Sequence, residues 1–225
     1  MKSGILFIVA TPIGNLEDIT LRALSVLKEA DAVICEEYRA GSTLLKKIGI
    51  EAKEIILLNE HNEKEEAQVV AKEMAQGKSY ALISDCGTPV FADPGTALIR
   101  WCNQMGVIVV PVPGPSSLMA AISLSPLPLD EFHFAGFLPR KQDIRRKKLA
   151  HLKQLRVPVI LMDAPYRLGK LLSETAAAFG KGTPATVAFD LTLPGEKIIH
   201  ASLGEILKTM KDKKGEFILI IHNNN

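Results

Sequence analysis

The 225-residue chain is poor in cysteine: it has only Cys35, Cys86 and Cys102, which lie far apart in the sequence. Their odd number and wide spacing exclude a disulfide framework and a cysteine-based metal site. We therefore expect no metal ion and expect all three cysteines to be small core residues.

Long apolar runs are absent as well. No stretch approaches the roughly 18 apolar residues that a membrane-spanning helix needs. The residues before the first apolar run, Met1 to Gly4, carry no signal-peptide pattern. We expect a cytoplasmic protein without a membrane partner.

Two phosphate-binding motifs are also missing. No GxGxxG follows the first apolar run, Ile5 to Val9, and GxxxxGK[ST] occurs nowhere in the chain. NAD and ATP are therefore poor candidates for the ligand.

What the chain does contain is typical of a globular protein of one large or two small domains, with 47% hydrophobic and 23% charged residues. Its positive charge is concentrated between Arg140 and Arg156, where eight Lys or Arg stand against one acid, Asp143. Two interpretations stay open for this basic segment: a solvated helix face, or a surface for a polyanion.

Apolar periodicity predicts five βα units in the first half, and hence a mostly parallel sheet with helices on both faces. The expected strands are Ile5 to Val9, Ala32 to Cys35, Ile55 to Leu58, Tyr80 to Ser84 and Val107 to Val110. The expected helices are Thr20 to Ala30, Ser42 to Ile48, Glu63 to Gln76, Gly95 to Met105 and Ser117 to Leu124.

Two prolines within Ser125 to Leu129 predict a domain boundary, giving an α/β domain over residues 1–124 and an α+β domain over 125–225. In the second domain we expect several antiparallel strand pairs, a helix over the basic segment, and a short helix capped by Ser202. The expected strands are Phe132 to Phe137, Pro158 to Met162, Thr186 to Asp190, Lys197 to Ala201 and Phe217 to Ile221.

Three loops of the first domain are rich in Gly and Pro and are interspersed with Asp, Ser and Thr. They begin at Thr11, Ser84 and Pro111, each at or next to the end of an expected strand. Because loops after parallel strands gather at one edge of the sheet, we expect the three to form a rigid backbone cup for a ligand.

The strings VATPIGNLEDITLRAL, SDCGTP, DPG, PVPGPSS and GFLPRK occur in this order and span nearly the whole chain. They resemble the ribosomal RNA small subunit methyltransferase I family, part of the tetrapyrrole methylase superfamily, which uses S-adenosylmethionine. The resemblance implies a two-domain tetrapyrrole methylase-like fold, with the cofactor in the cleft between the domains and usually a homodimer. It implies methylation of a ribose 2′-hydroxyl of a cytidine in 16S ribosomal RNA.

Carried over position by position, the resemblance also implies the cofactor-binding residues. They are Pro12, Asp85, Gly87, Thr88, Pro89, Ser116 and Ser117 in the first domain, and Met162, Pro165, Ala188 and Phe189 in the second. For Asp85 the alternative is a simple turn-forming residue.

The chain departs from the family at three positions expected at the cleft: Glu36-Glu37-Tyr38-Arg39, Asp163-Ala-Pro-Tyr-Arg167 and Asp190-Leu-Thr-Leu193. These departures keep two alternatives open, a small-molecule methyltransferase, for example for a tetrapyrrole, and a non-catalytic S-adenosylmethionine-binding protein. They also contain our catalytic candidates, with Asp163 assisting proton removal and Arg167 positioning the acceptor.

The other two catalytic candidates are Glu36 and Arg39, for which the alternative is a surface ion pair. For Tyr166 and Arg167 the alternative is packing at a helix start. In the basic segment we expect the phosphate-binding residues to be Arg140, Lys141, Arg145, Arg146 and Lys148.

Overall fold

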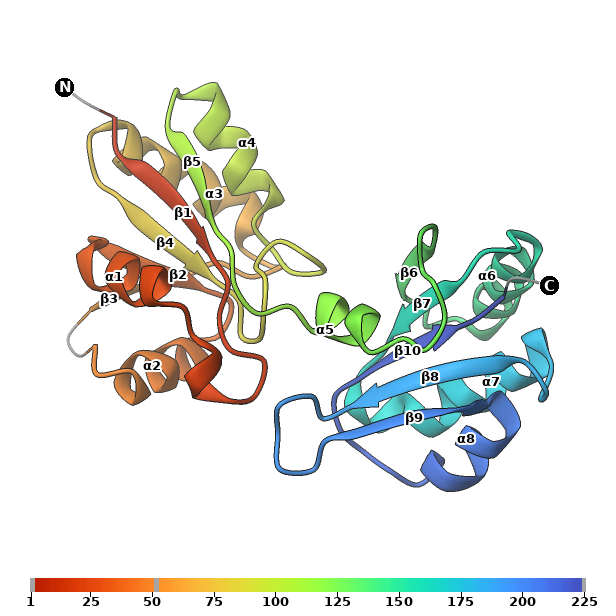
Figure 1. Ribbon diagram of the computed structural model, residues 1–225. Helices are drawn as coiled ribbons and strands as arrows, with labels where there is room; N and C mark the ends of the chain where they lie inside the picture. Colours follow the sequence, from red (N-terminus) through yellow and green to blue (C-terminus); the bar gives the residue numbers. More distant parts are fainter. Residues whose placement is uncertain (1–2, 51–52, 224–225) are drawn as a thin grey trace. The chain divides into compact units, whose positions relative to one another are not determined.

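The computed structural model describes residues 3–50 and 53–223, which divide into two compact units between Ser116 and Ser117 (Figure 1). The division falls before α5 (Ser117–Ser123), whereas the sequence placed the domain boundary after this helix. Helix α5 contacts strand β10 of the second unit, which accounts for its assignment there. No helix among the described residues is long and apolar enough to cross a membrane.

The first unit contains a five-stranded parallel sheet in the order β3-β2-β4-β1-β5, as the alternating pattern predicted. The strands are β1 (Ile5–Val9), β2 (Ala32–Cys35), β3 (Glu54–Leu57), β4 (Tyr80–Ile83) and β5 (Ile108–Val112). Successive side chains point to opposite faces, so Leu6 and Val9 enter different cores.

Helices cover both faces of this sheet (Figure 1). Helices α1 (Leu21–Glu29) and α2 (Tyr38–Lys47) pack on the side of Val9 and Val33. Helices α3 (Glu63–Ala75) and α4 (Thr96–Gln104) pack on the side of Leu6 and Tyr80. The prediction of helices on both faces is confirmed.

Helix α2 begins at Tyr38, one turn earlier than the sequence suggested, and its second turn contains Gly41. A Cβ on Gly41 would lie 2.6 Å from Sγ of Cys35. The glycine therefore allows α2 to lie directly against β2. Cys35 and Cys102 are buried as predicted, but Cys86 is exposed, so the expectation that all three are core residues is wrong for Cys86.

The second unit contains a mixed sheet in the order β6-β7-β10-β8-β9. Its strands are β6 (His133–Phe137), β7 (Val159–Met162), β8 (Pro184–Phe189), β9 (Lys197–Ser202) and β10 (Phe217–Ile221). Strands β6 and β7 are parallel and the other pairs are antiparallel, as predicted for an α+β domain.

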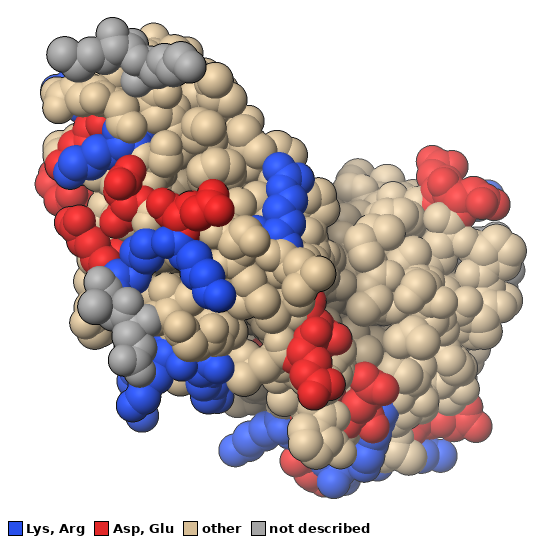
Figure 2. Space-filling model, turned by 60° about the vertical axis from the view of Figure 1, so that its left-hand side comes forward, with Lys and Arg blue, Asp and Glu red and all other residues tan. Residues whose placement is uncertain are grey.

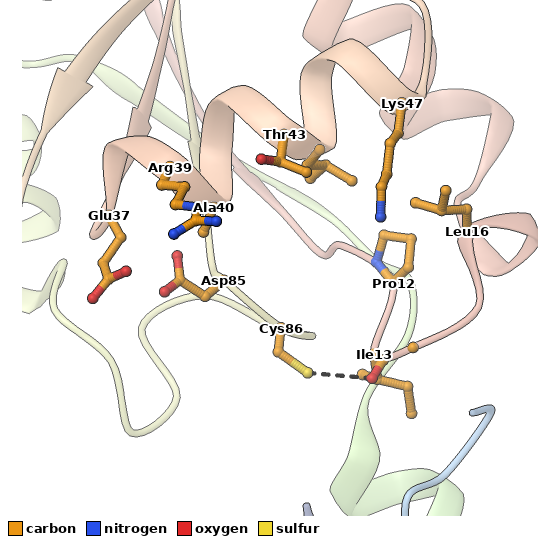
Figure 3. A pocket seen from close by; sticks show the side chains of 12 residues that line it. Pro12, Ile13, Leu16, Glu37, Arg39, Ala40, Thr43, Lys47, Asp85 and Cys86 are labelled. Atoms are coloured by element: carbon orange, nitrogen blue, oxygen red, sulfur yellow. Dashed lines mark hydrogen bonds between the residues drawn. The ribbon is translucent and has the colours of Figure 1, made fainter. Parts of the chain in front are cut away.

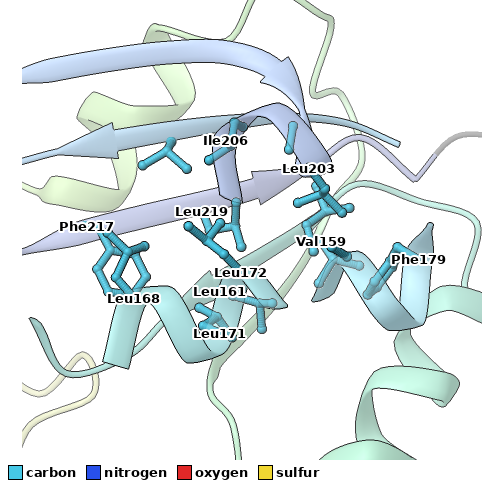
Figure 4. Packing of buried hydrophobic residues seen from close by; sticks show 14 of the residues in the cluster. Val159, Leu161, Leu168, Leu171, Leu172, Phe179, Leu203, Ile206, Phe217 and Leu219 are labelled. Atoms are coloured by element: carbon cyan, nitrogen blue, oxygen red, sulfur yellow. The ribbon is translucent and has the colours of Figure 1, made fainter. Parts of the chain in front are cut away.

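One face of this sheet packs on helices α6 (Gln142–Gln154), α7 (Leu168–Phe179) and α8 (Leu203–Met210). Figure 4 shows Leu161 and Leu219 of the sheet against Leu171 and Leu172 of α7. Ser202 caps α8 in a reciprocal capping box with Glu205, which confirms the predicted cap.

Candidate functional site

The three Gly- and Pro-rich loops follow β4, β1 and β5, which are adjacent strands of the parallel sheet. Their carboxyl ends therefore lie side by side, and the predicted gathering of these loops at one edge is confirmed. This edge is where open α/β sheets bind ligands.

Hydrogen bonds join the three loops to one another. The Thr11 amide donates to the Gly87 carbonyl at 2.8 Å, and the Thr11 hydroxyl donates to the Ser84 carbonyl at 3.0 Å. The Thr88 hydroxyl donates to the Pro115 carbonyl at 3.3 Å. The loops are thus held in shape by their own contacts, which lowers the entropic cost of binding.

The loop after β4 has an unusual backbone. Gly87 has φ +84°, and Val90 and Ala92 have φ +69° and +64°, a conformation that costs free energy in residues with a Cβ. A Cβ on Gly87 would lie 3.2 Å from Ile13 and 3.8 Å from the Pro115 carbonyl, so glycine lets the three loops meet. Strain of this kind clusters at ligand-binding sites.

A pocket of about 470 Å³ opens beside the loops that follow β1 and β4, a size suited to a small molecule (Figure 3). Cys86 forms part of its wall and donates from Sγ to the Ile13 carbonyl at 3.5 Å. The lining residues are Pro12, Ile13, Gly14, Leu16, Glu37, Arg39, Ala40, Thr43, Leu44, Lys47, Asp85 and Cys86.

Acidic side chains gather at the carboxyl ends of the neighbouring strands β2 and β4. We call Glu36, Glu37, Asp85 and Asp93 the carboxylate cluster. Burial raises the pKa of Asp85, and the charges of Glu37 and Asp93 raise it further. Burial also raises the pKa of Glu36, with added repulsion from Asp93 and Asp85. The cluster therefore favours a cationic ligand or a proton.

Helix α2 supplies a wall of the pocket that the sequence interpretation missed, apart from Arg39. Arg39, Thr43 and Lys47 are spaced by four residues and so share one face of the helix. Figure 3 shows the side chains of Glu37, Arg39 and Asp85 close together at one end of the pocket. The predicted helix began at Ser42 and so left out Arg39. A helix predicted from Tyr38 would have placed Arg39, Thr43 and Lys47 on one face through their i, i+4, i+8 spacing.

In the second unit, Arg145 is fully buried, so its prediction as a phosphate-binding residue is wrong. Its guanidinium donates to Asp163 at 2.8 Å, to Glu174, and to the Leu138 carbonyl at 3.4 Å. We call Arg145, Asp163, Glu174 and Arg167 the buried ion cluster, since Arg167 Nε lies 3.5 Å from Asp163 Oδ1.

Asp163 has both carboxylate oxygens engaged within this cluster. Oδ2 accepts from Arg145, and Oδ1 accepts from the Ala164 amide at 3.0 Å. Its side chain is only 3% exposed. These contacts suit Asp163 to holding Arg167 in place better than to meeting a substrate hydroxyl directly.

The remaining predicted residues of the second unit fall into two groups. Met162 and Pro165 are half-buried, whereas Ala188 and Phe189 are buried. The Phe189 side chain packs in the hydrophobic core, so only its backbone is free to line a site. In the basic segment, Arg140, Lys141 and Arg146 are exposed and Lys148 is half-buried.

Charges of both signs are mixed on the visible face of the first unit. On the face shown in Figure 2, Lys and Arg of the first unit lie beside Asp and Glu, so neither sign dominates there. The basic segment differs in composition, because it contains eight Lys or Arg and a single acid.

Most of the chain is similar to known proteins. Residues 6–207 match the family described as Tetrapyrrole (Corrin/Porphyrin) Methylases. The chain is 40% identical over 222 residues to the Ribosomal RNA small subunit methyltransferase I of Vibrio cholerae serotype O1, covering 97% of this chain and 77% of that protein. It is 35% identical to the protein of the same name from Leptospira biflexa, covering 99% of this chain and 92% of the relative.

Solved structures agree on the architecture. Diphthine synthase gives a TM-score of 0.77 at 20% identity, covering 98% of this chain and 90% of that chain. A uroporphyrin-III-C-methyltransferase from Thermus thermophilus gives a TM-score of 0.65 at 19% identity, covering 98% and 95%. At these identities the likeness shows the fold alone, which is the tetrapyrrole methylase-like fold that the motifs implied.

Proposed function

The chain belongs to the ribosomal RNA small subunit methyltransferase I family, within the tetrapyrrole methylases, and from this premise we propose that it methylates a ribose 2′-hydroxyl of a cytidine in 16S ribosomal RNA. The observation that carries the proposal is the match of 97% of the chain to a relative of that name at 40% identity. The exposed cations at the start of α6 favour a polyanionic substrate over a small molecule.

The first unit fits S-adenosylmethionine as the methyl donor. This cofactor carries two positive charges, on its sulfonium and ammonium groups, and the carboxylate cluster offers negative charge beside preorganised loops. When bound, it supplies an electrophilic methyl group. We propose that it contacts Pro12, Asp85, Gly87, Thr88, Pro89, Ser116 and Ser117, together with Met162, Pro165, Ala188 and the backbone of Phe189.

Methyl transfer to a hydroxyl needs the oxygen held in line with the sulfonium carbon, and a nearby base can take the proton. Glu36 suits the second task, because burial and neighbouring carboxylates raise its pKa and so make it a better proton acceptor than an ordinary glutamate. We assign Arg39 and Arg167 to holding the substrate phosphate or the developing negative charge. Asp163 then acts through Arg167.

For the RNA we propose contacts from Arg140, Lys141, Arg146 and Lys148, and we leave out Arg145 because it is buried. We further propose that the protein is cytoplasmic and acts as a homodimer, as the resemblance of its motifs to the family implies.

The methyl acceptor is tested by comparing masses of 16S rRNA fragments from a deletion strain and its parent. The proposal expects one cytidine-containing fragment to be lighter by a methyl group in the deletion strain. Restoring the wild-type gene should return the mass, and restoring a Glu36→Gln variant should not. Identical fragment masses in both strains would overturn the rRNA assignment.

The cofactor is tested by calorimetry with S-adenosylhomocysteine. We expect one site per chain, weakened about tenfold or more by Asp85→Ala, the loss typical of a charged contact. Asp18→Ala, which removes an exposed carboxylate that follows the first loop but is not part of the pocket lining, serves as the matched control. Absence of binding by the wild-type protein would contradict the assignment.

A further inference from the structure

Two large aromatic side chains are exposed where neighbouring strands of the second unit end. Phe137 is the last residue of β6 and is 52% exposed, and Tyr166 follows the end of β7 and is 72% exposed. Phe137 pairs with Met162, the last residue of β7, so the two strands end side by side. Packing at a helix start, one of the interpretations left open for Tyr166, does not agree with this exposure.

The buried ion cluster connects the residue after Phe137 with the residue after Tyr166. Arg145 donates to the carbonyl of Leu138, the residue after Phe137. It also donates to Asp163, which lies 3.5 Å from Arg167, the residue after Tyr166. One buried guanidinium therefore holds the two aromatic positions in a defined arrangement, which reduces the entropy that a ligand would have to remove.

Exposed cations lie close to the same strand ends. Arg140 and Lys141 follow Phe137 directly before α6, and Arg146 lies in the second turn of this helix. Asp143 is the single acid of this segment. Aromatic faces next to cations are the combination that single-stranded nucleic acid binds, because bases stack on the rings and phosphates meet the positive charge.

We propose that Phe137, Arg140, Lys141, Arg146 and Tyr166 form an aromatic-basic surface that binds an unpaired segment of RNA, with bases stacked on Phe137 and Tyr166. This inference rests on the proposed function, and it narrows the substrate to a single-stranded region. A duplex would not satisfy the site, because the faces of its bases are already covered by their neighbours.

The experiment measures binding of a fluorescent, unstructured RNA of about 12 nucleotides, within the usual range of site sizes, by anisotropy in the presence of S-adenosylhomocysteine. Tyr166→Ala and Phe137→Ala should each weaken binding by about 5- to 100-fold, the loss typical of one stacked base. Tyr166→Phe, which keeps the ring, should stay within about twofold. Tyr166→Leu keeps an apolar side chain of moderate size but should lose affinity as Tyr166→Ala does.

Phe132→Ala is the matched control, because Phe132 is 36% exposed at the opposite end of β6. Salt dependence separates the two kinds of contact. The aromatic variants should keep the wild-type slope of log affinity against log salt, whereas Arg146→Ala should lower it by about 0.7.

The outcomes distinguish this inference from the proposed function. Wild-type binding with unchanged affinity in Tyr166→Ala and Phe137→Ala would overturn the stacking surface and leave the proposed function standing. Equal affinity for a duplex of the same sequence would also overturn it. If the wild-type protein binds no RNA while S-adenosylhomocysteine still binds, the surface fails, and the rRNA assignment is decided by the fragment masses of the deletion strain.

Discussion

At the scale of single residues, the guanidinium of Arg145 should have a large effect on stability. Arg145→Ala would leave Asp163 buried without its main counter-charge, and breaking a buried ion pair in this way typically costs about 3–5 kcal/mol. We expect this loss in the free energy of unfolding measured with urea and circular dichroism. Arg146→Ala, at the exposed neighbouring position, should change it by less than about 0.5 kcal/mol. Equal stabilities of the two variants would contradict the assigned role.

The spacing of residues in the basic segment indicates that Arg145 is buried, although the sequence interpretation expected it to bind phosphate. Arginine is usually exposed, so the sequence interpretation grouped Arg145 with the phosphate-binding cations. Yet Arg145, Leu149 and Leu152 are spaced as one helix face, and both leucines are buried. Spacing alone would have placed Arg145 on the apolar side. The identity of its partners, Asp163 and Glu174, depends on tertiary contacts that no local pattern contains.

Asp85 should show the opposite behaviour, because its ionised form destabilises the folded protein. Its pKa is raised from the ordinary 3.8, chiefly by burial and then by Glu37. The ionised Asp85 therefore lowers the free energy of unfolding at a pH above its raised pKa. This loss of stability disappears as the pH falls from the raised pKa toward 3.8. The Asp85 side chain is solvent-accessible, so water screens most of this loss. Asp85→Asn should therefore raise the Tm at pH 7 by no more than about 1 °C, and this gain should shrink in acid.

Thermal unfolding of both proteins over a pH series checks this prediction, with Asp18→Asn as the exposed control. A lower Tm for Asp85→Asn at neutral pH would show that Asp85 stabilises the fold instead of being retained for a ligand.

At the scale of elements, the close packing of helix α2 on strand β2 depends on Gly41. Gly41→Ala would place a methyl group 2.6 Å from Sγ of Cys35, so either the Cys35 side chain or the helix has to shift. Overpacking of this kind costs about 1–3 kcal/mol, and a shift of the helix would also move Arg39, Thr43 and Lys47 in the pocket. We expect lower stability in urea and weaker S-adenosylhomocysteine binding.

Gly182→Ala is the matched control, since nothing lies within 4 Å of the added methyl group. Cys35→Ala in the Gly41→Ala background should recover part of the lost stability, because it removes the sulfur. A Gly41→Ala protein as stable as the Gly182→Ala protein would disprove the close-packing argument.

The start of α2 shows why element boundaries were harder to predict than the elements themselves. Glu37 occupies the N-cap position but makes no side-chain cap hydrogen bond, and Gly41 disfavours helix in the second turn. Both local signals point away from a helix here, and packing on β2 overrides them. By contrast, Ile5 to Val9 and Phe217 to Ile221 were predicted to the residue, because their apolar runs have clear ends.

At the scale of the whole molecule, the proposed homodimer has a direct test. Light scattering should report about twice the chain mass of 24.5 kDa. The result should not change between the wild-type protein and Tyr166→Ala, because we assign Tyr166 to RNA and not to the partner subunit. A mass of one chain at micromolar concentration would contradict the dimer.

The βα pattern predicted a parallel sheet but could not supply its strand order, because periodicity records which residues are buried and not which strands are neighbours. That order matters for the site. It places β4 next to β1 and β1 next to β5, and only then do the loops at Thr11, Ser84 and Pro111 meet.

The division of the chain also has a consequence for synthesis. All five strands of the first sheet lie between Ile5 and Val112, and none of their pairings waits for a residue of the second unit. At translation rates of about 5–20 residues per second, the ribosome needs roughly 5–20 s to go on from Val112 to Ile221, the end of the last strand of the second sheet. The first sheet can therefore assemble outside the exit tunnel while the strands of the second are still being made, so the two sheets need not compete for each other's strands.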